Sequence, residues 1–304
     1  MLTSFDYGSY LTWRLPAYSM SIDGRTIFPD SVAAPDAYRI GVRHIEGGQV
    51  STAVRHELAA GDTVELQSPK GGFVLPLRNE FPVVLIAGGI GITPFLSYLE
   101  TLEGGTDEPR VTLHYGCRDG ASRPFHHRLE ALRQRLPNLT LVTHLSRPRS
   151  GDRFDRLGRL TASDIDAELL RKRARIYMCA SDATMEEVGA GLQARGVPVF
   201  EIFKERFRSP APPALDGLKS RQIHFARSGR TLTWSPQAPL ASILAAAESA
   251  GIAIPSGCRV GQCESCAVPV KTGEVRHLVD CPELDEGHCL TCQAVPLSDL
   301  VIDA

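Results

Sequence analysis

The spacing of hydrophobic and polar residues changes twice along the chain, which divides it into three blocks. In the first block, from residue 8 to about residue 76, short stretches of alternating apolar and polar residues are separated by glycine, proline and aspartate. These stretches cover residues 10–15, 37–42 and 63–66. A two-residue alternation indicates strands with one buried face, and closely spaced turn residues favour an antiparallel barrel.

The second block, residues 81–207, alternates strongly apolar stretches with segments of helical periodicity. The predicted strands are VVLIA (83–87), VTLHY (111–115), LTLVTHL (139–145), RIYMC (175–179) and VFEIF (199–203). Strands that alternate with helices in this way are typical of an α/β domain. The pattern therefore predicts a doubly wound parallel sheet.

Two helices of this block have recognisable ends. Pro94 suits a first helical turn because that turn does not need its N–H, and Gly104-Gly105 ends the apolar spacing that follows. In the same way Asp182 precedes a second apolar helix, and Gly196 stands where that helix stops.

The third block follows a proline-rich stretch, SPAPPALDG at residues 209–217, which is typical of a semi-rigid linker. It opens with a hairpin pattern in which residues 223–227 and 231–234 flank a Ser228-Gly229 turn. A helix is expected over residues 239–250, and a cysteine-rich segment comes after it.

Composition narrows the possible functions. With 304 residues, 43% of them hydrophobic, the chain is long enough for two or three domains that each bury a core. The formal net charge of −2 leaves no basic excess to neutralise phosphates, so neither nucleic acid nor an anionic membrane is an expected partner. The first ten residues lack the basic and apolar regions of a signal peptide, and a cytoplasmic location is expected.

One stretch could be mistaken for a membrane span, because residues 81–99 carry no charge over 19 positions. It contains three glycines and two prolines, however. These residues favour a buried strand, a glycine loop and the start of a helix.

The cysteines are concentrated near the C-terminus, where six of the eight lie between residues 258 and 292. Three thiolates on one loop with C-x4-C-x2-C spacing, plus a distant fourth, is the arrangement that holds a 2Fe-2S cluster in plant-type ferredoxins. Gly257 and Gly261 fit such a loop, because glycine tolerates positive φ and lets backbone N–H groups approach the sulfides. The predicted ligands are Cys258, Cys263, Cys266 and Cys292.

A structural zinc site is the alternative, since the C-x2-C pairs 263/266 and 289/292 are separated by 22 residues. That reading leaves Cys258 and the loop glycines unexplained. Plain buried thiols are a third possibility. Under the iron–sulfur interpretation, Cys281 and Cys289 are not ligands.

A second motif, GGIGITP at residues 88–94, follows the first strand of the α/β block. Glycines leave room for a pyrophosphate against the backbone, and the helix that starts at Pro94 offers free N–H groups and the positive end of its dipole. A tight turn with no ligand is the alternative. The predicted cofactor-binding residues of this loop are Gly88, Gly89, Gly91, Thr93 and Pro94.

These two loops together resemble a known family. The last 80 or so residues look like a plant-type ferredoxin domain, and residues 8–207 resemble the ferredoxin–NADP reductase superfamily. The order of the domains, with flavin first, nicotinamide second and ferredoxin last, is that of the phthalate dioxygenase reductase-like branch. The resemblance implies a flavin-binding antiparallel β-barrel at residues 1–78, an NAD(P)-binding α/β domain at 79–208, a linker at 209–221 and a 2Fe-2S ferredoxin domain of the α+β β-grasp type at 222–304. The barrel would lack about 30 residues of its usual beginning.

For the nicotinamide, the resemblance implies two contacts beyond the glycine loop. The superfamily usually carries Cys-Gly-Pro after its fourth strand, and this chain has Cys179-Ala180-Ser181. Cys179 is thus implied as the catalytic contact and Arg118 as a contact to the adenosine portion. An ordinary buried thiol and a solvated arginine are the alternatives.

For the flavin, the resemblance points to three segments. The R-x-Y-S motif corresponds to residues 25–28, RTIF, or to Tyr18-Ser19, and neither matches fully. GGQVST at residues 47–52 resembles a phosphate turn, unless Ser51 only caps a helix. Residues 205–207, ERF, resemble the segment beside the flavin ring, although an aromatic there could equally be core. The implied contacts are Arg25, Gly48, Val50, Ser51, Glu205 and Phe207.

The implied function is that of an NAD(P)H-dependent reductase that passes electrons through a flavin and a 2Fe-2S cluster to an oxygenase or another acceptor protein. FAD is expected, with FMN as the alternative, and NADH and NADPH are both open. The protein is expected to be a monomer with a modest, transient docking surface for its acceptor. Two alternatives remain: a non-enzymatic redox sensor or zinc-stabilised binding module, and a flavin reductase with a vestigial iron–sulfur domain.

Overall fold

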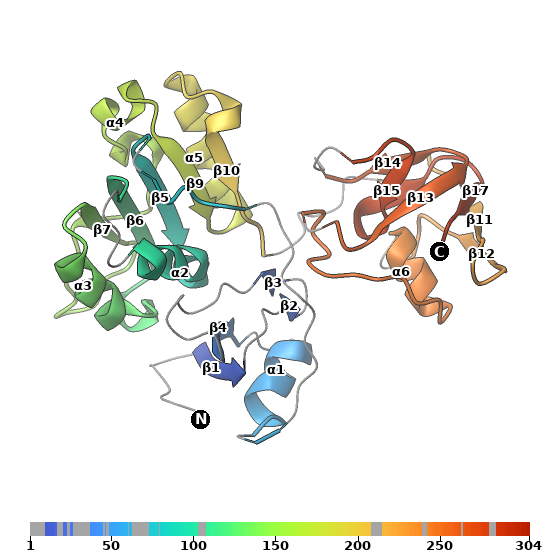
Figure 1. The fold of residues 1–304 in the computed structure, drawn as a ribbon, viewed down its shortest axis with the longest axis horizontal. Coiled ribbons are helices and arrows are strands. Elements are labelled where there is room, and N and C mark those ends of the chain that lie inside the picture. Colours follow the sequence, from blue (N-terminus) through green and yellow to red (C-terminus); the bar gives the residue numbers. More distant parts are fainter. Residues whose placement is uncertain are drawn as a thin grey trace. The chain divides into compact units, whose positions relative to one another are not determined.

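The protein is described here by a computed structural model (Figure 1). The described residues are 10–16, 21–22, 25–26, 37–44, 46, 49–59, 61–62, 73–78, 80–102, 108–207, 215–238, 242–262, 264–279 and 284–304. Contacts divide the chain into two compact units, and each is treated by itself. In the described part of the chain, every helix is too short or too polar to cross a membrane.

A six-stranded parallel sheet forms most of the first unit. Its strands are β5 (Val83–Gly88), β6 (Val111–Cys117), β7 (Leu139–Leu145), β8 (Arg156–Leu157), β9 (Arg175–Cys179) and β10 (Ile202–Lys204). Their spatial order is β10-β9-β5-β6-β7-β8, and every neighbouring pair is parallel. The chain moves from β5 to one side through β6 and to the other side through β9, so the topological switch point lies between β5 and β9.

Helices cover both faces of this sheet (Figure 1). They are α2 (Thr93–Leu102), α3 (His126–Arg135), α4 (Ala167–Arg171) and α5 (Asp182–Ala194), with 3-10 turns η1 (Gly89–Ile92), η2 (Gly120–Ser122), η3 (Ala162–Asp164) and η4 (Val199–Glu201). On the α4–α5 face, Val84 and Ile86 of β5 pack against Met185, Val188 and Leu192 of α5. The predicted α/β sheet is therefore confirmed, and the uncharged stretch 81–99 is a strand, a glycine turn and a helix start.

Two local predictions in this block were wrong. The strand expected over residues 199–203 is a 3-10 turn followed by β10, which begins at Ile202. Val199 and Phe200 are exposed because the turn after Pro198 carries them past the edge of the sheet. The cap of α5 is Ser181 rather than Asp182, since the Ser181 hydroxyl accepts a hydrogen bond from the backbone N–H of Thr184.

The first block of the chain contributes two antiparallel strand pairs and one helix to the described structure. β1 (Tyr10–Pro16) pairs with β4 (Ala37–Arg43), as the alternation predicts. α1 (Gln49–His56) follows, and a short pair is formed by β2 (Ser21–Ile22) and β3 (Arg25–Thr26). The strand expected at residues 63–66 lies outside the described residues. The described part of this block shows no closed barrel.

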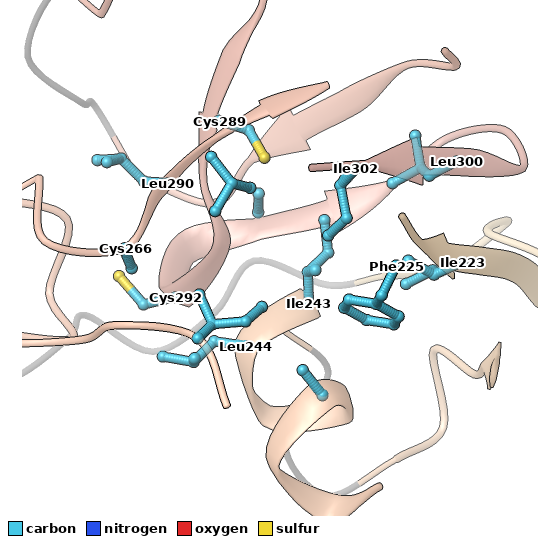
Figure 2. Packing of buried hydrophobic residues seen from close by; sticks show 14 of the residues in the cluster. Ile223, Phe225, Ile243, Leu244, Cys266, Cys289, Leu290, Cys292, Leu300 and Ile302 are labelled. Atoms are coloured by element: carbon cyan, nitrogen blue, oxygen red, sulfur yellow. The ribbon is translucent and has the colours of Figure 1, made fainter. Parts of the chain in front are cut away.

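The second unit contains a five-stranded sheet with the order β12-β11-β17-β13-β15. Its strands are β11 (Arg221–Phe225), β12 (Arg230–Trp234), β13 (Ala267–Thr272), β15 (His288–Leu290) and β17 (Leu300–Ile302), and a side pair is formed by β14 (Val275–His277) and β16 (Ala294–Pro296). The predicted hairpin is confirmed, with Gly229 at φ +66° in its turn. Figure 2 shows α6 (Ile243–Ser249) placing two residues in the core, Ile243 beside Phe225 and Leu244 toward Cys292.

Two histidines are buried side by side within the parallel sheet. His114 on β6 and His144 on β7 are 3.2 Å apart between Nδ1 and Nε2, and both are buried. Burial, with His144 as a further cause, lowers the pKa of His114 to about 4, and burial also lowers the pKa of His144. The folded protein therefore keeps this pair neutral.

The histidine pair makes stability depend on pH. Below pH 6.5 the histidines of the unfolded chain bind protons, whereas the buried pair of the folded protein stays neutral. The free energy of unfolding should therefore fall as the pH drops from about 7 to about 4, by on the order of 3 kcal/mol. Urea titrations at several pH values measure this loss. Replacing His114 with Gln should flatten the dependence in that window, and an unchanged slope would refute the assignment.

Candidate functional site

The glycine loop lies at the carboxyl end of β5, where the sheet switches direction. β5 ends at Gly88, η1 follows, and α2 begins at Thr93 with Pro94 in its first turn. Gly89 has a φ of +53°, a left-handed conformation that glycine adopts without strain. The Thr93 hydroxyl donates to the carbonyl of Ile90 at 3.1 Å, which ties the turn to the helix start. All five residues predicted for this loop thus form one strand–turn–helix unit.

The loop is packed tightly against the end of β9. A Cβ on Gly91 would overlap the carbonyl oxygen of Cys179, and one on Gly88 would lie 2.8 Å from the Cβ of Ala180. Ala180 replaces the glycine usual in the superfamily's motif, and Gly88 accommodates it. Side chains at either glycine would push the two loops apart.

Cys179 lies directly beneath this loop, with its thiol buried to 1% exposure. Burial raises its pKa well above the usual value, and the neighbouring Glu205 raises it further. The thiol is therefore neutral at physiological pH. Glu205 is held at this end of the sheet by its backbone N–H, which donates to the Met178 carbonyl at 2.9 Å. The structure thus brings together Gly91, Cys179 and Glu205, which were predicted from separate segments.

Arg118 follows β6 at the same edge of the sheet and is exposed. Its partner Asp119 is buried at 4% side-chain exposure and also binds Arg149, whose Nε and terminal nitrogen lie 3.0 and 2.9 Å from Oδ2. Hydrogen bonds from Ser122, with Arg149 as a further cause, lower the pKa of Asp119. The Asp119 carboxylate is therefore engaged in contacts within the protein, while the guanidinium groups of Arg118 and Arg149 remain at the surface.

Asp119 and Arg149 were not predicted from the sequence. Asp119 and Ser122 form a reciprocal capping box over η2, a local signal that could have identified Asp119. Arg149 is 30 residues away, and only the packing of the loops after β6 and β7 brings it close. No local pattern indicates that pairing.

The residues predicted to hold a flavin fall into different parts of the structure. Ser51 is the third residue of α1 and is buried, so it is not the helix cap that the alternative assumed. Val50 belongs to the same first turn, and Gly48 lies outside the described residues. Arg25, on β3, and half-buried Phe207 are both assigned by contacts to the second unit, whereas Glu205 belongs to the first.

Gly41 is a further site residue that the sequence did not reveal. It lies on β4, and a Cβ there would come within 3.0 Å of Thr93 and 3.2 Å of Ile90. β4 therefore packs directly on the glycine loop, which brings the first block of the chain against the predicted nicotinamide site.

The cysteine loop, residues 257–266, carries two of the described predicted ligands. The thiol of Cys266 hydrogen-bonds that of Cys292, and this contact, together with burial and with the nearby Cys258, raises the pKa of Cys292. Figure 2 shows Cys266 and Cys292 side by side at one end of the core. The Sγ of Cys258 accepts a hydrogen bond from the backbone N–H of Gln262 at 3.3 Å. Cys263 lies outside the described residues.

The backbone of this loop is strongly curved by residues with positive φ. Gly261 has a φ of +80°, as predicted, whereas Gly257 does not enter the left-handed region. Arg259 and Glu264 do so instead, each with a φ of +55°. Loop curvature therefore depends on two residues with side chains, which only surrounding interactions can stabilise in this conformation.

Cys289 behaves as a core residue. It is fully buried, pairs with Val268 in the β13–β15 ladder, and burial raises its pKa to about 12. The pKa of Cys292 is raised by contact with Cys266 and by the nearby Cys258, and Cys266 also raises the pKa of Cys289. Cys281, the other predicted non-ligand, lies outside the described residues.

The described residues fit a 2Fe-2S cluster in part. Soft thiolates are the ligands that iron–sulfur clusters require, and backbone N–H groups directed at sulfur are typical of their surroundings. The thiols of Cys266 and Cys292 are in contact, Cys258 lies near enough to raise the pKa of Cys292, and the N–H of Gln262 points to the Cys258 sulfur. Within the described set, which leaves out Cys263, no three His, Cys, Asp or Glu side chains are gathered closely enough to hold a metal ion.

Two family models match the chain. The model for the 2Fe-2S iron-sulfur cluster binding domain covers residues 225–297, and the model for the oxidoreductase NAD-binding domain covers residues 85–189. The first spans every predicted cluster ligand. The second begins within β5 and includes the glycine loop, Arg118 and Cys179.

Curated proteins match over most of the chain. One of the subunits of 1,2-phenylacetyl-CoA epoxidase from Escherichia coli K12 is 30% identical over 291 residues, covering 88% of this chain and 80% of that protein. The ferredoxin reductase component of 3-ketosteroid-9-alpha-monooxygenase from Rhodococcus rhodochrous is 28% identical, with 96% and 85% covered. The beta subunit of a heme-dependent oxidative N-demethylase from Ectopseudomonas mendocina is 31% identical, with 91% and 81% covered.

Solved structures show the same fold. Phthalate dioxygenase reductase matches all of this chain and 96% of its own, with a TM-score of 0.62 and 22% identity. An intact type IV self-sufficient cytochrome P450 monooxygenase matches all of this chain with 40% of its own, at a TM-score of 0.68 and 20% identity. These matches confirm the multi-domain architecture that was expected from the sequence.

The packing of Gly91 gives a direct test of the glycine loop. Replacing Gly91 with Ala should cost on the order of 2 kcal/mol of unfolding free energy, because the new methyl group overlaps the Cys179 carbonyl. Gly116→Ala is the matched control, since its Cβ would lie at an ordinary 3.6 Å from the Ala87 carbonyl. Urea unfolding of both variants makes the comparison. Equal stabilities would show that the loop does not pack on β9.

Proposed function

Because this chain belongs to the ferredoxin–NADP reductase superfamily, among the oxygenase reductases that carry a C-terminal 2Fe-2S domain, we propose that it passes electrons from NADH or NADPH to an oxygenase component. The observation that carries the proposal is the presence in one chain of a glycine loop at a sheet's switch point and a curved loop whose Cys266 thiol contacts that of Cys292. When bound, the flavin and the cluster convert the two-electron hydride of the nicotinamide into single electrons.

The nicotinamide dinucleotide binds across the carboxyl edge of the parallel sheet. Its pyrophosphate lies against Gly88, Gly89 and Gly91. The first turn of α2, which opens with Thr93 and Pro94, offers it the backbone N–H groups that follow Pro94. Arg118 binds the adenosine portion. Cys179 supports the nicotinamide end as a neutral thiol, which requires no proton transfer. This assignment is supported by the closeness of Gly91 to Cys179.

The flavin binds where the first block meets the glycine loop, in an antiparallel barrel to which β1 and β4 contribute. Val50 and Ser51 in the first turn of α1, together with Gly48 before it in the sequence, hold its phosphate, and Arg25 is the further contact that the family resemblance implies. Glu205 and Phe207 line the ring. The packing of Gly41 on Thr93 supports this placement, since hydride transfer requires the two cofactors to be adjacent. FAD is the proposed flavin, with FMN as the alternative.

Cys258, Cys263, Cys266 and Cys292 hold the 2Fe-2S cluster. Its potential starts from about −400 mV, the value typical of plant-type ferredoxins, and is adjusted by hydrogen bonds to its sulfurs. The proposed domains are residues 1–78 for flavin, 79–208 for nicotinamide and 222–304 for the cluster, joined by the linker 209–221. The protein acts as a monomer in the cytoplasm and docks transiently on its acceptor.

An absorption spectrum tests the whole proposal. Anaerobically prepared and reconstituted protein should show overlapping flavin and iron–sulfur bands that bleach on addition of NADH or NADPH. Comparing the two nucleotides identifies the preferred donor. A featureless visible spectrum after reconstitution, or zinc in place of iron and sulfide, would contradict the proposal.

Cysteine variants test the ligand set. Cys258→Ser should lose iron and sulfide, and electron delivery to a one-electron acceptor protein should fall at least about tenfold, while NAD(P)H oxidation with ferricyanide persists because it bypasses the cluster. Cys289→Ala, which removes a buried core thiol, should keep its cluster. If Cys289→Ala loses bound metal and Cys258→Ser retains it, the two C-x2-C pairs bind the metal instead.

A further inference from the structure

The segment around Cys292 reaches back to both ends of the curved part of the cysteine loop. Thr291 and Gln293 flank Cys292 in η5 (Thr291–Gln293) and are buried, with 0% and 6% exposure. The Thr291 hydroxyl donates to the Cys266 carbonyl at 3.0 Å, and the Thr291 N–H donates to the same oxygen at 3.2 Å. The side-chain amide of Gln293 donates to the Arg259 carbonyl at 2.7 Å.

The hydrogen bond from Gln293 supports Arg259, a residue with an unusual backbone conformation. Arg259 has a φ of +55°, a conformation that L-residues with side chains rarely adopt. Its guanidinium is held from the other direction by Glu248 of α6, at 2.7 and 3.1 Å. Arg259 is therefore fixed through its carbonyl by η5 and through its side chain by α6.

Fixing this carbonyl also fixes the next N–H. The peptide bond between Arg259 and Val260 is planar and trans, so its C=O and N–H point in opposite directions. An anchored carbonyl therefore sets the direction of the Val260 N–H within the loop that carries the ligands. Backbone N–H groups around the sulfurs are among the determinants of a cluster's potential.

From these contacts we propose that Gln293, with Thr291, is a positioning residue that holds the cysteine loop in its ligand-binding shape before and after cluster insertion. The inference rests on the proposed 2Fe-2S site. Gln293 does not touch the cluster in this role and acts through the Arg259 peptide. Thr291 fixes the opposite end of the loop at Cys266. Thr291 and Gln293 thus allow the segment around Cys292 to hold both ends of the loop in place, in addition to supplying a ligand.

The first test compares Gln293→Met with the wild type in the full-length, reconstituted protein. Methionine keeps the length and burial of the side chain and removes the donor. Loss of iron to an anaerobic chelator should become about tenfold faster, because the Arg259 carbonyl loses the hydrogen bond that Gln293 donates to it. The midpoint potential of the cluster should also shift. Gln222→Met is the control, since it removes an exposed side-chain hydrogen bond to Thr233 in the same unit.

A second pair of variants covers the case in which Gln293→Met fails to fold. Thr291→Val removes the hydroxyl at nearly constant volume, and Thr291→Ser retains it. Chelator release should accelerate in Thr291→Val and return to near the wild-type rate in Thr291→Ser. A role limited to packing predicts the reverse, because Val fills the core as Thr does and Ser leaves a gap.

The outcomes separate this inference from the proposed function. Wild-type protein with no iron or sulfide would overturn both. A loaded wild type whose release rate and potential equal those of Gln293→Met would overturn the positioning role alone. Faster release and a shifted potential in Gln293→Met, with Gln222→Met unchanged, would support it.

Discussion

The contact between the ends of β5 and β9 is the constraint on which the candidate site of the first unit depends. Parallel neighbours bring their carboxyl ends to one edge, and the missing side chains at Gly88 and Gly91 let the turn after β5 lie on Cys179 and Ala180. Without that approach, α2 could not start where it does. Gly41 extends the same principle, because β4 comes close to this turn only through another absent side chain.

Both units stabilise unusual backbone in the same way. Arg173 has a φ of +57°, and its guanidinium donates to the buried Glu201 at 2.9 and 2.7 Å. Arg259 has nearly the same φ and binds Glu248 in the other unit. In each case an arginine occupies a position where glycine would be the default, and a carboxylate fixes its side chain. The conformation is thus supported by tertiary interactions rather than by residue preference.

The sequence predicted those features that depend on neighbouring residues. The order strand, glycine turn and helix over residues 83–102 was readable because apolar runs, glycines and Pro94 each carry a local meaning. Cysteine spacing was informative for the same reason, since most predicted ligands lie on one short loop. Residues 199–203 were misread because β-branched and aromatic residues favour strands, whereas Pro198 and the end of the sheet favour a turn there. The pairs Asp119–Arg149 and Arg259–Gln293 bridge 30 and 34 positions, and only folding reveals such contacts.

The position of β17 has a consequence for how the second unit is built. This strand lies in the middle of the sheet, parallel to β11 and antiparallel to β13, yet in sequence it comes after all four predicted ligand cysteines. During synthesis, the thiol-bearing segments therefore leave the ribosome before the strand that joins the two halves of their sheet. The sheet that carries these segments is therefore completed only after all four cysteines have been synthesised.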